Sequence, residues 1–235
     1  MFRVPSPAVP VGVIANIATV LVGTTIGAVS GTRFPERIRE TVMGSLGLLT
    51  AAVGVRQILP SSEFPLVLGA VLIGAVIGEL LRIEGGLKAL GERLQRRFAG
   101  EGGDSRFGEG FIVASLVFCI GPLTIIGSIE DGLGDPELLL VKSGLDGFAS
   151  IAFAAVYGWG VGLSIIAIAV IQGGLALAAG TLDGVLTDPM LDALGAAGGV
   201  LLLGISLRLL DLKQIRVANL LPAVVLAPLF VRWWG

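Results

Sequence analysis

Residues 119–147 decide the fold and read CIGPLTIIGSIEDGLGDPELLLVKSGLDG. Gly121 and Pro122 interrupt an apolar run in this stretch, and an acidic, glycine-rich loop follows. Proline has no backbone N–H and disrupts the helical turn before it, which leaves carbonyl groups without a helical partner. The stretch therefore predicts a broken helix near Gly121 and Pro122. The alternative is a kinked packing helix followed by an ordinary loop.

The composition of the whole chain is that of a membrane protein. Hydrophobic residues make up 54% of the 235 residues, and charged residues only 14%, against about 25% charged residues in ordinary soluble domains. So few charges cannot cover a soluble globular surface, and so apolar a chain is not disordered. We therefore expect an all-α polytopic membrane protein with a single transmembrane domain over residues 1–235.

The rare residue types exclude several functions. The formal net charge is −2, so there is no global basic signal for nucleic acid. The chain has no histidine and one cysteine, Cys119, which excludes His-ligated metals and cysteine metal clusters. The motifs HExxH and GxSxG and a glycine-rich phosphate loop with its lysine are absent. We expect no metal site, no cofactor, no nucleic-acid partner and no enzymatic activity.

Eight apolar stretches approach the length of about 20 residues that crosses about 30 Å of hydrocarbon. They cover roughly residues 11–31, 43–60, 64–82, 110–128, 137–157, 160–182, 190–210 and 217–234. Six spans would remain if the fifth and sixth stretches formed one re-entrant hairpin, so we expect six to eight.

The distribution of basic residues predicts the orientation. Loops on the cytoplasmic side of a membrane carry an excess of lysine and arginine. With eight spans, 12 of the 16 basic residues fall on the side that holds neither terminus, and the opposite loops are acidic. We therefore expect both termini outside. The 12 residues are Arg33, Arg37, Arg39, Arg82, Lys88, Arg93, Arg96, Arg97, Arg106, Arg208, Lys213 and Arg216.

Residues 83–108 form the one long polar stretch between spans. Apolar side chains recur in it at helical spacing, at Ile83, Leu87, Leu90, Leu94 and Phe98, with basic residues around them. This pattern predicts an amphipathic connector on the cytoplasmic surface, anchored to anionic lipid. A regulatory or partner-binding role is the alternative.

Glycines four or five residues apart mark the first and third predicted spans. Gly23, Gly27 and Gly31 stand in the first span, and Gly69, Gly74 and Gly78 in the third. Small residues at this spacing let helix backbones approach closely. We expect these faces to pack helices together, either within the chain or across a homodimer.

The two ends of the chain show a faint internal similarity. Residues 12–59 and residues 160–209 share a similar order of glycine and leucine positions when gaps are allowed. The second copy begins five spans after the first and would cross the membrane in the opposite sense. This arrangement predicts an inverted-topology repeat.

Two charged residues lie inside the fifth predicted span. Lys142 and Asp146 are four apart and so share a helix face. At 1.5 Å per residue, Asp146 is about 13 Å into the span, close to the midplane. Ionisable groups at this depth are functional by default, although a structural ion pair is the alternative. We expect a substrate or ion pathway lined by Gly121, Pro122, Ser128, Glu130, Asp131, Lys142 and Asp146.

Four further polar residues are secondary candidates for the pathway. Asn16, Gln172 and Asn219 stand in or at the ends of spans, where hydrogen bonding between helices also explains them. Glu79 stands at the inner end of the third span, and we expect it to pair with Arg82 at the surface rather than to act as a gate.

The order of several runs resembles the YqgA/YdfK-like family of bacterial membrane proteins, a domain-of-unknown-function family. The resemblance covers essentially the whole chain, and Ile171 replaces the tyrosine usual before QGG. It implies a bacterial inner-membrane protein of the kind described as a transporter, and it carries over no substrate and no catalytic residue. The matching runs are GEGFIVASLVFCIGPLTIIGSIEDGL at 108–133, LLLVKSGLDGFASIAF at 138–153, VIQGG at 170–174 and VANLLPAVVLAPL at 217–229.

These observations together predict a multi-pass secondary transporter for a small ion or polar metabolite. Coupling to a proton or another cation through Asp146 is part of this hypothesis. The expected partners are the lipid bilayer, the transported ion or metabolite, and a second copy of the chain in a homodimer. The alternatives are a dimeric ion channel and a regulatory or structural membrane subunit.

Overall fold

The computed structural model describes residues 10–31, 35–98, 106–182 and 184–235, and no strand occurs among them. The all-α architecture expected from the sequence is confirmed. The elements are α1 (Val11–Gly31), α2 (Glu36–Ile58), α3 (Phe64–Leu81), α4 (Ile83–Phe98), α5 (Arg106–Cys119), α6 (Pro122–Leu133), α7 (Glu137–Tyr157), the 3₁₀ helix η1 (Gly158–Leu163), α8 (Ser164–Leu177), α9 (Ala179–Leu182), α10 (Asp188–Leu209), the 3₁₀ helix η2 (Val217–Leu220) and α11 (Leu221–Trp234).

Six helical stretches in the described part of the chain are long and apolar enough to span a membrane, and α5 with α6 forms a bent pair that raises the number to seven. One of the six, Glu137–Leu177, holds 41 residues. A straight helix of that length would be about 60 Å long, twice the hydrocarbon thickness. Leu139 near its start and Ala176 near its end instead pack together on Val13, so the chain reverses at η1. With this reversal the stretch Glu137–Leu177 forms two antiparallel passes, α7 and α8, and not one long span.

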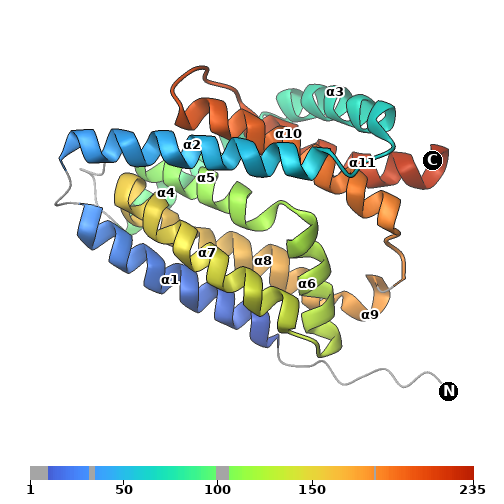
Figure 1. Ribbon diagram of the computed structural model, residues 1–235, viewed down its shortest axis with the longest axis horizontal. Coiled ribbons are helices and arrows are strands. Elements are labelled where there is room, and N and C mark those ends of the chain that lie inside the picture. Colours follow the sequence, from blue (N-terminus) through green and yellow to red (C-terminus); the bar gives the residue numbers. More distant parts are fainter. Residues whose placement is uncertain (1–9, 32–34, 99–105, 183) are drawn as a thin grey trace.

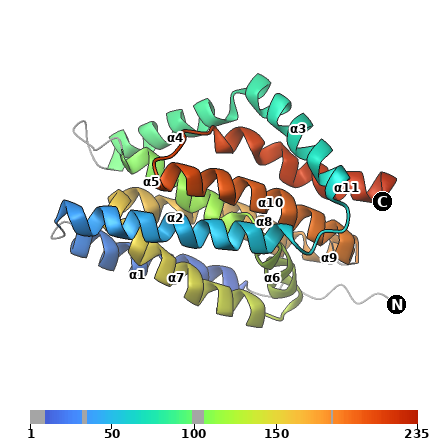
Figure 2. The ribbon, with the colours of Figure 1, turned by 45° about the horizontal axis from the view of Figure 1, so that its top comes forward.

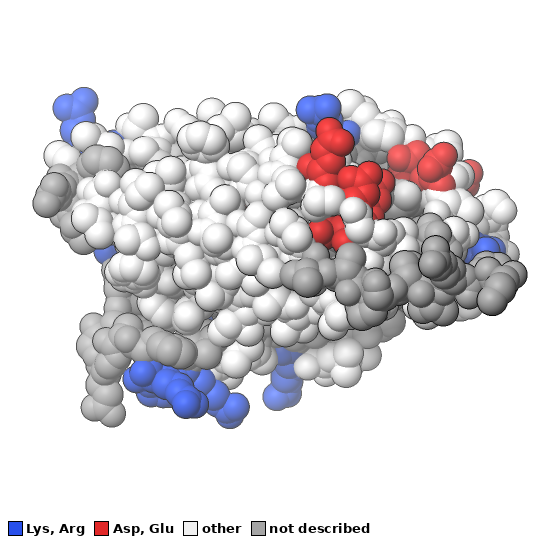
Figure 3. Space-filling model, turned by 90° about the horizontal axis from the view of Figure 1, so that it is seen from below, with Lys and Arg blue, Asp and Glu red and all other residues white. Residues whose placement is uncertain are grey.

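The described chain starts and finishes at the same end of the molecule. Helices α1, α2, α7 and α10 run along the long axis of the molecule, and α1 begins at the same end at which α11 finishes (Figures 1 and 2). The lateral surface exposes many large apolar side chains, such as Leu72, Phe148 and Leu177. Seen from below, the central part of this surface is largely free of charge, the basic side chains lie mainly at its margins, and the acidic side chains gather toward one end (Figure 3). Such an apolar belt suits a lipid environment.

The glycine face of α1 packs against α7 within the chain. A Cβ atom added at Gly27 would lie 2.2 Å from the carbonyl oxygen of Ile151, and one added at Gly31 would lie 2.2 Å from that of Ala155. On α3, a Cβ at Gly78 would lie 1.9 Å from the carbonyl oxygen of Asn219. Both glycine faces are therefore covered inside one protomer. A homodimer would have to use another surface.

Helix pairs from the two ends of the chain pack on one another in opposite directions. Helix α2 lies against α10, and α3 lies against α11. Gly54 and Gly199 meet at the first crossing, where a Cβ on either would lie within 2.8 Å of the other's carbonyl oxygen. An inverted-topology repeat would produce such antiparallel pairs, but the repeat itself stays a prediction.

Helix α4 lies within the stretch 83–108 in which the sequence predicts an amphipathic connector, and its place on the cytoplasmic surface stays a prediction. Leu87 packs against the main core, and Gly91 lies on Gly108 at the start of α5. Arg93 and its basic neighbours Arg96 and Arg97 are exposed. Leu87 thus faces the bundle and the arginines face outward, whereas Leu90, predicted on the apolar face, is exposed. The side chains of Arg33, Arg39, Leu94 and Phe98 lie outside the described residues.

Candidate functional site

The predicted break lies between α5 and α6, which meet at a bend of 67°. Pro122 is the first residue of α6, a position at which the missing N–H of proline costs nothing. In a continuous helix, however, residue 122 would donate to the carbonyl oxygen of Phe118, four residues earlier. Because residue 122 is proline, that carbonyl has no helical partner. The break therefore creates a free backbone acceptor in the interior.

Side chains from other parts of the chain supply the missing donors. Lys142 Nζ donates to the Phe118 carbonyl oxygen at 2.8 Å, Thr124 Oγ1 at 3.1 Å and Gln172 Nε2 at 3.4 Å. Phe118 is fully buried. A cation at this position also suits the negative end of the α5 dipole. Three helices thus converge on the end of a fourth.

Lys142 and Asp146 form a buried ion pair on α7. Their side chains are each 10% exposed, and Lys142 Nζ contacts Asp146 Oδ2 directly. The spacing of four residues brings them together on one face, as the sequence predicts. The pair faces α1, α5 and α8 and not the lipid belt.

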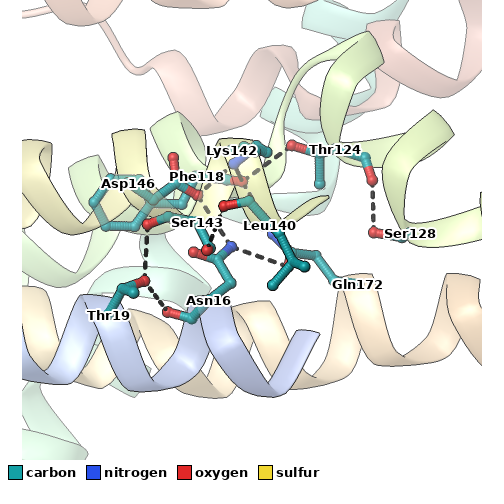
Figure 4. Close-up of polar contacts among 10 residues, drawn as sticks. All are labelled: Asn16, Thr19, Phe118, Thr124, Ser128, Leu140, Lys142, Ser143, Asp146 and Gln172. Carbon is teal, nitrogen blue, oxygen red and sulfur yellow. Dashed lines mark hydrogen bonds and ion pairs between the residues drawn. The ribbon is translucent and has the colours of Figure 1, made fainter. Parts of the chain in front are cut away.

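Two amides complete a central polar cluster, which consists of Asn16, the Phe118 carbonyl, Lys142, Asp146 and Gln172 (Figure 4). Asn16 Nδ2 donates to Asp146 Oδ2 and to Gln172 Oε1, both at 3.0 Å. Asn16 and Gln172 have no exposed surface. Asn16 Oδ1 is buried and has no hydrogen-bond partner among the described residues. The cluster therefore holds an unused acceptor.

Hydroxyl groups around the cluster join it to the helices. Thr19 donates to the Ser143 carbonyl oxygen at 2.8 Å, which links α1 to α7 beside the ion pair. Ser128, a predicted pathway residue, donates to the Thr124 carbonyl oxygen within α6. Ser128 lies one turn beyond Thr124, and among the described residues it makes no hydrogen bond to a member of the central polar cluster. Its role here is local to α6.

Asp131 and Glu130 do not join the central polar cluster. Asp131 accepts from the N–H groups of Gly12 and Val13 at 2.9 and 3.0 Å, so it satisfies donors at the start of α1. Glu130 is half-buried at the end of α6. The turn that follows depends on Gly134, whose φ of +102° favours glycine. The acidic loop thus ties α6, α7 and α1 together at one end of the bundle.

Glu79 and Asn219 belong to a second network, at the junction of α3, α4, α10 and η2. Glu79 pairs with Arg216 and accepts from Asn219, so the expected pair with Arg82 is wrong. Arg82 instead ends α3 in a left-handed conformation, with φ of +53°. That conformation takes the chain out of α3 and into α4.

The centre of this second network was not predicted. Glu84 is buried and accepts from Arg208 Nη1 at 3.1 Å and from the N–H of Ala218 at 3.0 Å. Arg208 also donates to Glu109 at 3.2 Å, and the N–H of Glu84 donates to Asn219 at 2.7 Å. Glu84 and Arg208 stand at span ends, where the sequence indicates surface charges. Only the tertiary arrangement brings them together.

The fold and the central polar cluster define a multi-pass α-helical membrane protein with a buried ion pair at a broken helix. Among the described residues, no group of three or more histidine, cysteine, aspartate or glutamate side chains forms a metal site. The chain belongs to the family described as "Protein of unknown function (DUF554)", which matches residues 11–232.

Two relatives extend the match over nearly the whole chain. The "Uncharacterized protein YqgA" of Escherichia coli (strain K12) is 33% identical over 228 residues, which cover 95% of this chain and 97% of the relative. The "Uncharacterized membrane protein YdfK" of Bacillus subtilis (strain 168) is 28% identical over 225 residues, 94% of this chain and 95% of the relative. The resemblance noted in the sequence is thereby confirmed. No solved structure matched the chain.

Proposed function

We propose that this protein is a secondary transporter that carries a small ion or polar solute across the bacterial inner membrane through the central polar cluster. One observation carries the proposal. A buried Lys142–Asp146 pair meets the Phe118 carbonyl, which Pro122 deprives of its helical partner. Broken helices with free carbonyl ends recur at the ion and substrate sites of transporters. The proposal assigns no catalytic reaction and no cofactor.

The energetic cost of the cluster supports a role beyond packing. A charged side chain at the bilayer centre costs about 2.5–3.5 kcal/mol on insertion scales. Apolar residues of similar volume often replace a buried ion pair with no loss of stability. A cluster built only to hold four helices together would therefore gain little from charge. A ligand that exchanges with the pair gives the charges a function.

The charges at the two ends of the bundle support an orientation. We assign the end with the exposed arginines of α4 and the basic residues near the ends of α3 and α10 to the cytoplasm, because this assignment follows the positive-inside rule. The described start of α1 and the end of α11 would then lie outside. The acidic loop after α6, with Asp135 and Glu137 exposed, would face the same outer side.

The test is solute uptake by proteoliposomes that contain the purified protein. The panel holds ²²Na⁺, ⁸⁶Rb⁺, ³⁶Cl⁻, labelled amino acids and labelled organic acids, each with an imposed gradient. Asp146→Asn removes the buried carboxylate, and Glu137→Gln is the matched control because it removes an exposed carboxylate from the same helix. We expect one class of solute to enter with wild type and with Glu137→Gln but not with Asp146→Asn. Equal uptake by all three proteins for every solute would contradict the proposal.

A further inference from the structure

We infer that the central polar cluster is a binding site for a small monovalent cation and that the Lys142 ammonium occupies this site in the present conformation. The inference rests on the proposed transport function and names its substrate class. It starts from what surrounds Lys142 Nζ. The ammonium lies on the Phe118 carbonyl oxygen at 2.8 Å and on Asp146 Oδ2.

The cluster supplies oxygen atoms suited to a cation. Asp146 provides a carboxylate, the end of α5 provides a backbone carbonyl, and Gln172 provides an amide oxygen that already faces Asn16. Carbonyl oxygens from unwound helix ends coordinate Na⁺ in transporters that use broken helices. A single carboxylate balances one positive charge, whereas divalent ions are usually bound by several carboxylates or by substrate phosphates. The donor set therefore favours a monovalent ion.

The unused acceptor of Asn16 is an independent observation. Asn16 has no exposed surface, and its Oδ1 atom has no partner among the described residues. A buried amide oxygen without a partner costs free energy. It lies in the same cluster, since Nδ2 of the same amide bonds to Asp146 and Gln172. A bound cation would give Asn16 Oδ1 a partner. The Lys142 ammonium makes no hydrogen bond to this oxygen.

The position of Lys142 allows it to leave the site. Lys142 stands one helical turn closer to the start of α7 than Asp146, about 7 Å from that start. Its flexible four-carbon stem can carry the ammonium toward water while the apolar part stays buried. Exposed Asp135 lies at that end of the bundle. It would receive the ammonium and attract an incoming cation.

Replacement of the Lys142 ammonium by a monovalent cation keeps the net charge of the central polar cluster constant. With Lys142 in place, the pair is neutral, and with a monovalent cation on Asp146 it is neutral again. No proton or electron has to be supplied. Lys142 thus acts as an internal competitor, and removing it should open the site. A purely structural ion pair predicts instead that removing Lys142 leaves Asp146 buried without any counter-ion.

The test is the thermal stability of Lys142→Gln in detergent at one pH, in choline, sodium, potassium and ammonium chloride at equal concentration. We expect the Tm of this variant to rise by about 5 °C or more from choline to at least one small cation. Wild type, Lys213→Gln and the double variant Lys142→Gln/Asp146→Asn should each change far less. Lys213 is an exposed lysine, and the double variant has no charged side chain in the central polar cluster.

A direct measurement accompanies the melting curves. After purification in potassium chloride and removal of salt, Lys142→Gln should bind about one ⁸⁶Rb⁺ per chain, displaced by potassium or ammonium but not by choline, and the double variant should bind none. Three results would each overturn the inference. Lys142→Gln could have the same Tm in every salt, or the double variant could show an equal rise in Tm. Lys142→Gln could also fail to fold in every salt while the double variant folds.

The uptake experiment separates this inference from transport itself. Asp146-dependent uptake of an anion or a neutral solute, without cation rescue of Lys142→Gln, would remove the cation assignment and leave the transport proposal. Cation rescue without Asp146-dependent uptake of any solute would remove the transport function on which the substrate assignment rests.

Discussion

Lys142 donates to the carbonyl oxygen of Phe118 at 2.8 Å, across 24 positions of sequence. The contact exists because residue 122, the helical partner that the carbonyl would otherwise have, is proline. The break in the fourth predicted span and the charge in the fifth are thus two parts of one structural feature. This feature places a cation, an anion and a free carbonyl in the interior of the bundle.

The ion pair predicts strong coupling between two single substitutions. Asp146→Asn and Lys142→Gln should each lower the free energy of unfolding by about 3–5 kcal/mol in a choline buffer, because each leaves one buried charge without its partner. The double variant should lose clearly less than the sum of the two. Unfolding in detergent, followed by a double-mutant cycle, measures this coupling. Additive losses would show that the two charges do not depend on one another.

The close approach of α1 and α7 predicts that alanine substitutions at two glycines have very different effects on stability. Gly27→Ala should destabilise the protein by several kcal/mol, because the new Cβ would lie 2.2 Å from the backbone oxygen of Ile151. Gly173→Ala on α8 is the matched control, since a Cβ there meets no atom within 4 Å. It should be neutral or raise stability by up to about 1 kcal/mol. The melting temperatures of the two variants in detergent measure this difference. Equal melting temperatures would contradict the close packing of α1 on α7.

Asp131 should behave as a capping residue and not as part of the ligand site. Asp131→Ala should cost about 1–2 kcal/mol, because two N–H groups at the start of α1 lose their acceptor. The cation dependence of Lys142→Gln stability should be unchanged when Asp131→Ala is added. Thermal melts in the salt series measure both quantities. If Asp131→Ala abolished the cation dependence of Lys142→Gln stability, Asp131 would be part of the cation site.

The second network predicts that Arg208 is essential for stability. Arg208→Gln should cost about 3–5 kcal/mol, because buried Glu84 would lose its main counter-ion. Arg93→Gln, an exposed arginine on α4, should change stability by about 0.5 kcal/mol or less. Unfolding of the two variants in parallel is the measurement. A mild effect of Arg208→Gln would mean that Lys88, 3.5 Å from Glu84, suffices as a partner.

The sequence predicts those parts of the site that break a local pattern. Lys142 and Asp146 are conspicuous because they are charged within an apolar span, and Pro122 because it interrupts one. The amides of Asn16 and Gln172 are weaker signals, since interhelical hydrogen bonds explain such residues in many membrane helices. Phe118 is not among the predicted residues, because it contributes its backbone carbonyl and not its side chain. A proline four residues later nevertheless indicates a carbonyl without a helical partner.

The remaining features depend on tertiary contacts that no local pattern specifies. The glycines of α1 predict close packing but not that α7 is the partner. Glu84 and Arg208 lie 124 positions apart at span ends, where their residue types suggest the membrane surface. Asp131 stands in an acidic stretch that the sequence predicts as a loop and a ligand site, yet it lies in α6 and its side chain reaches the start of α1. In each case the residue type is informative and its partner is set by the assembled bundle.

Counterflow in proteoliposomes tests transport through the central polar cluster most directly, because it separates a carrier with a binding site from a channel. Vesicles are loaded with a high concentration of the unlabelled solute identified by the uptake panel and diluted into a trace of the labelled solute. Transport through the central polar cluster predicts a transient accumulation of label above its equilibrium level with wild type and Glu137→Gln, and none with Asp146→Asn. Label that only equilibrates, or accumulation that persists in Asp146→Asn, would contradict transport through the central polar cluster.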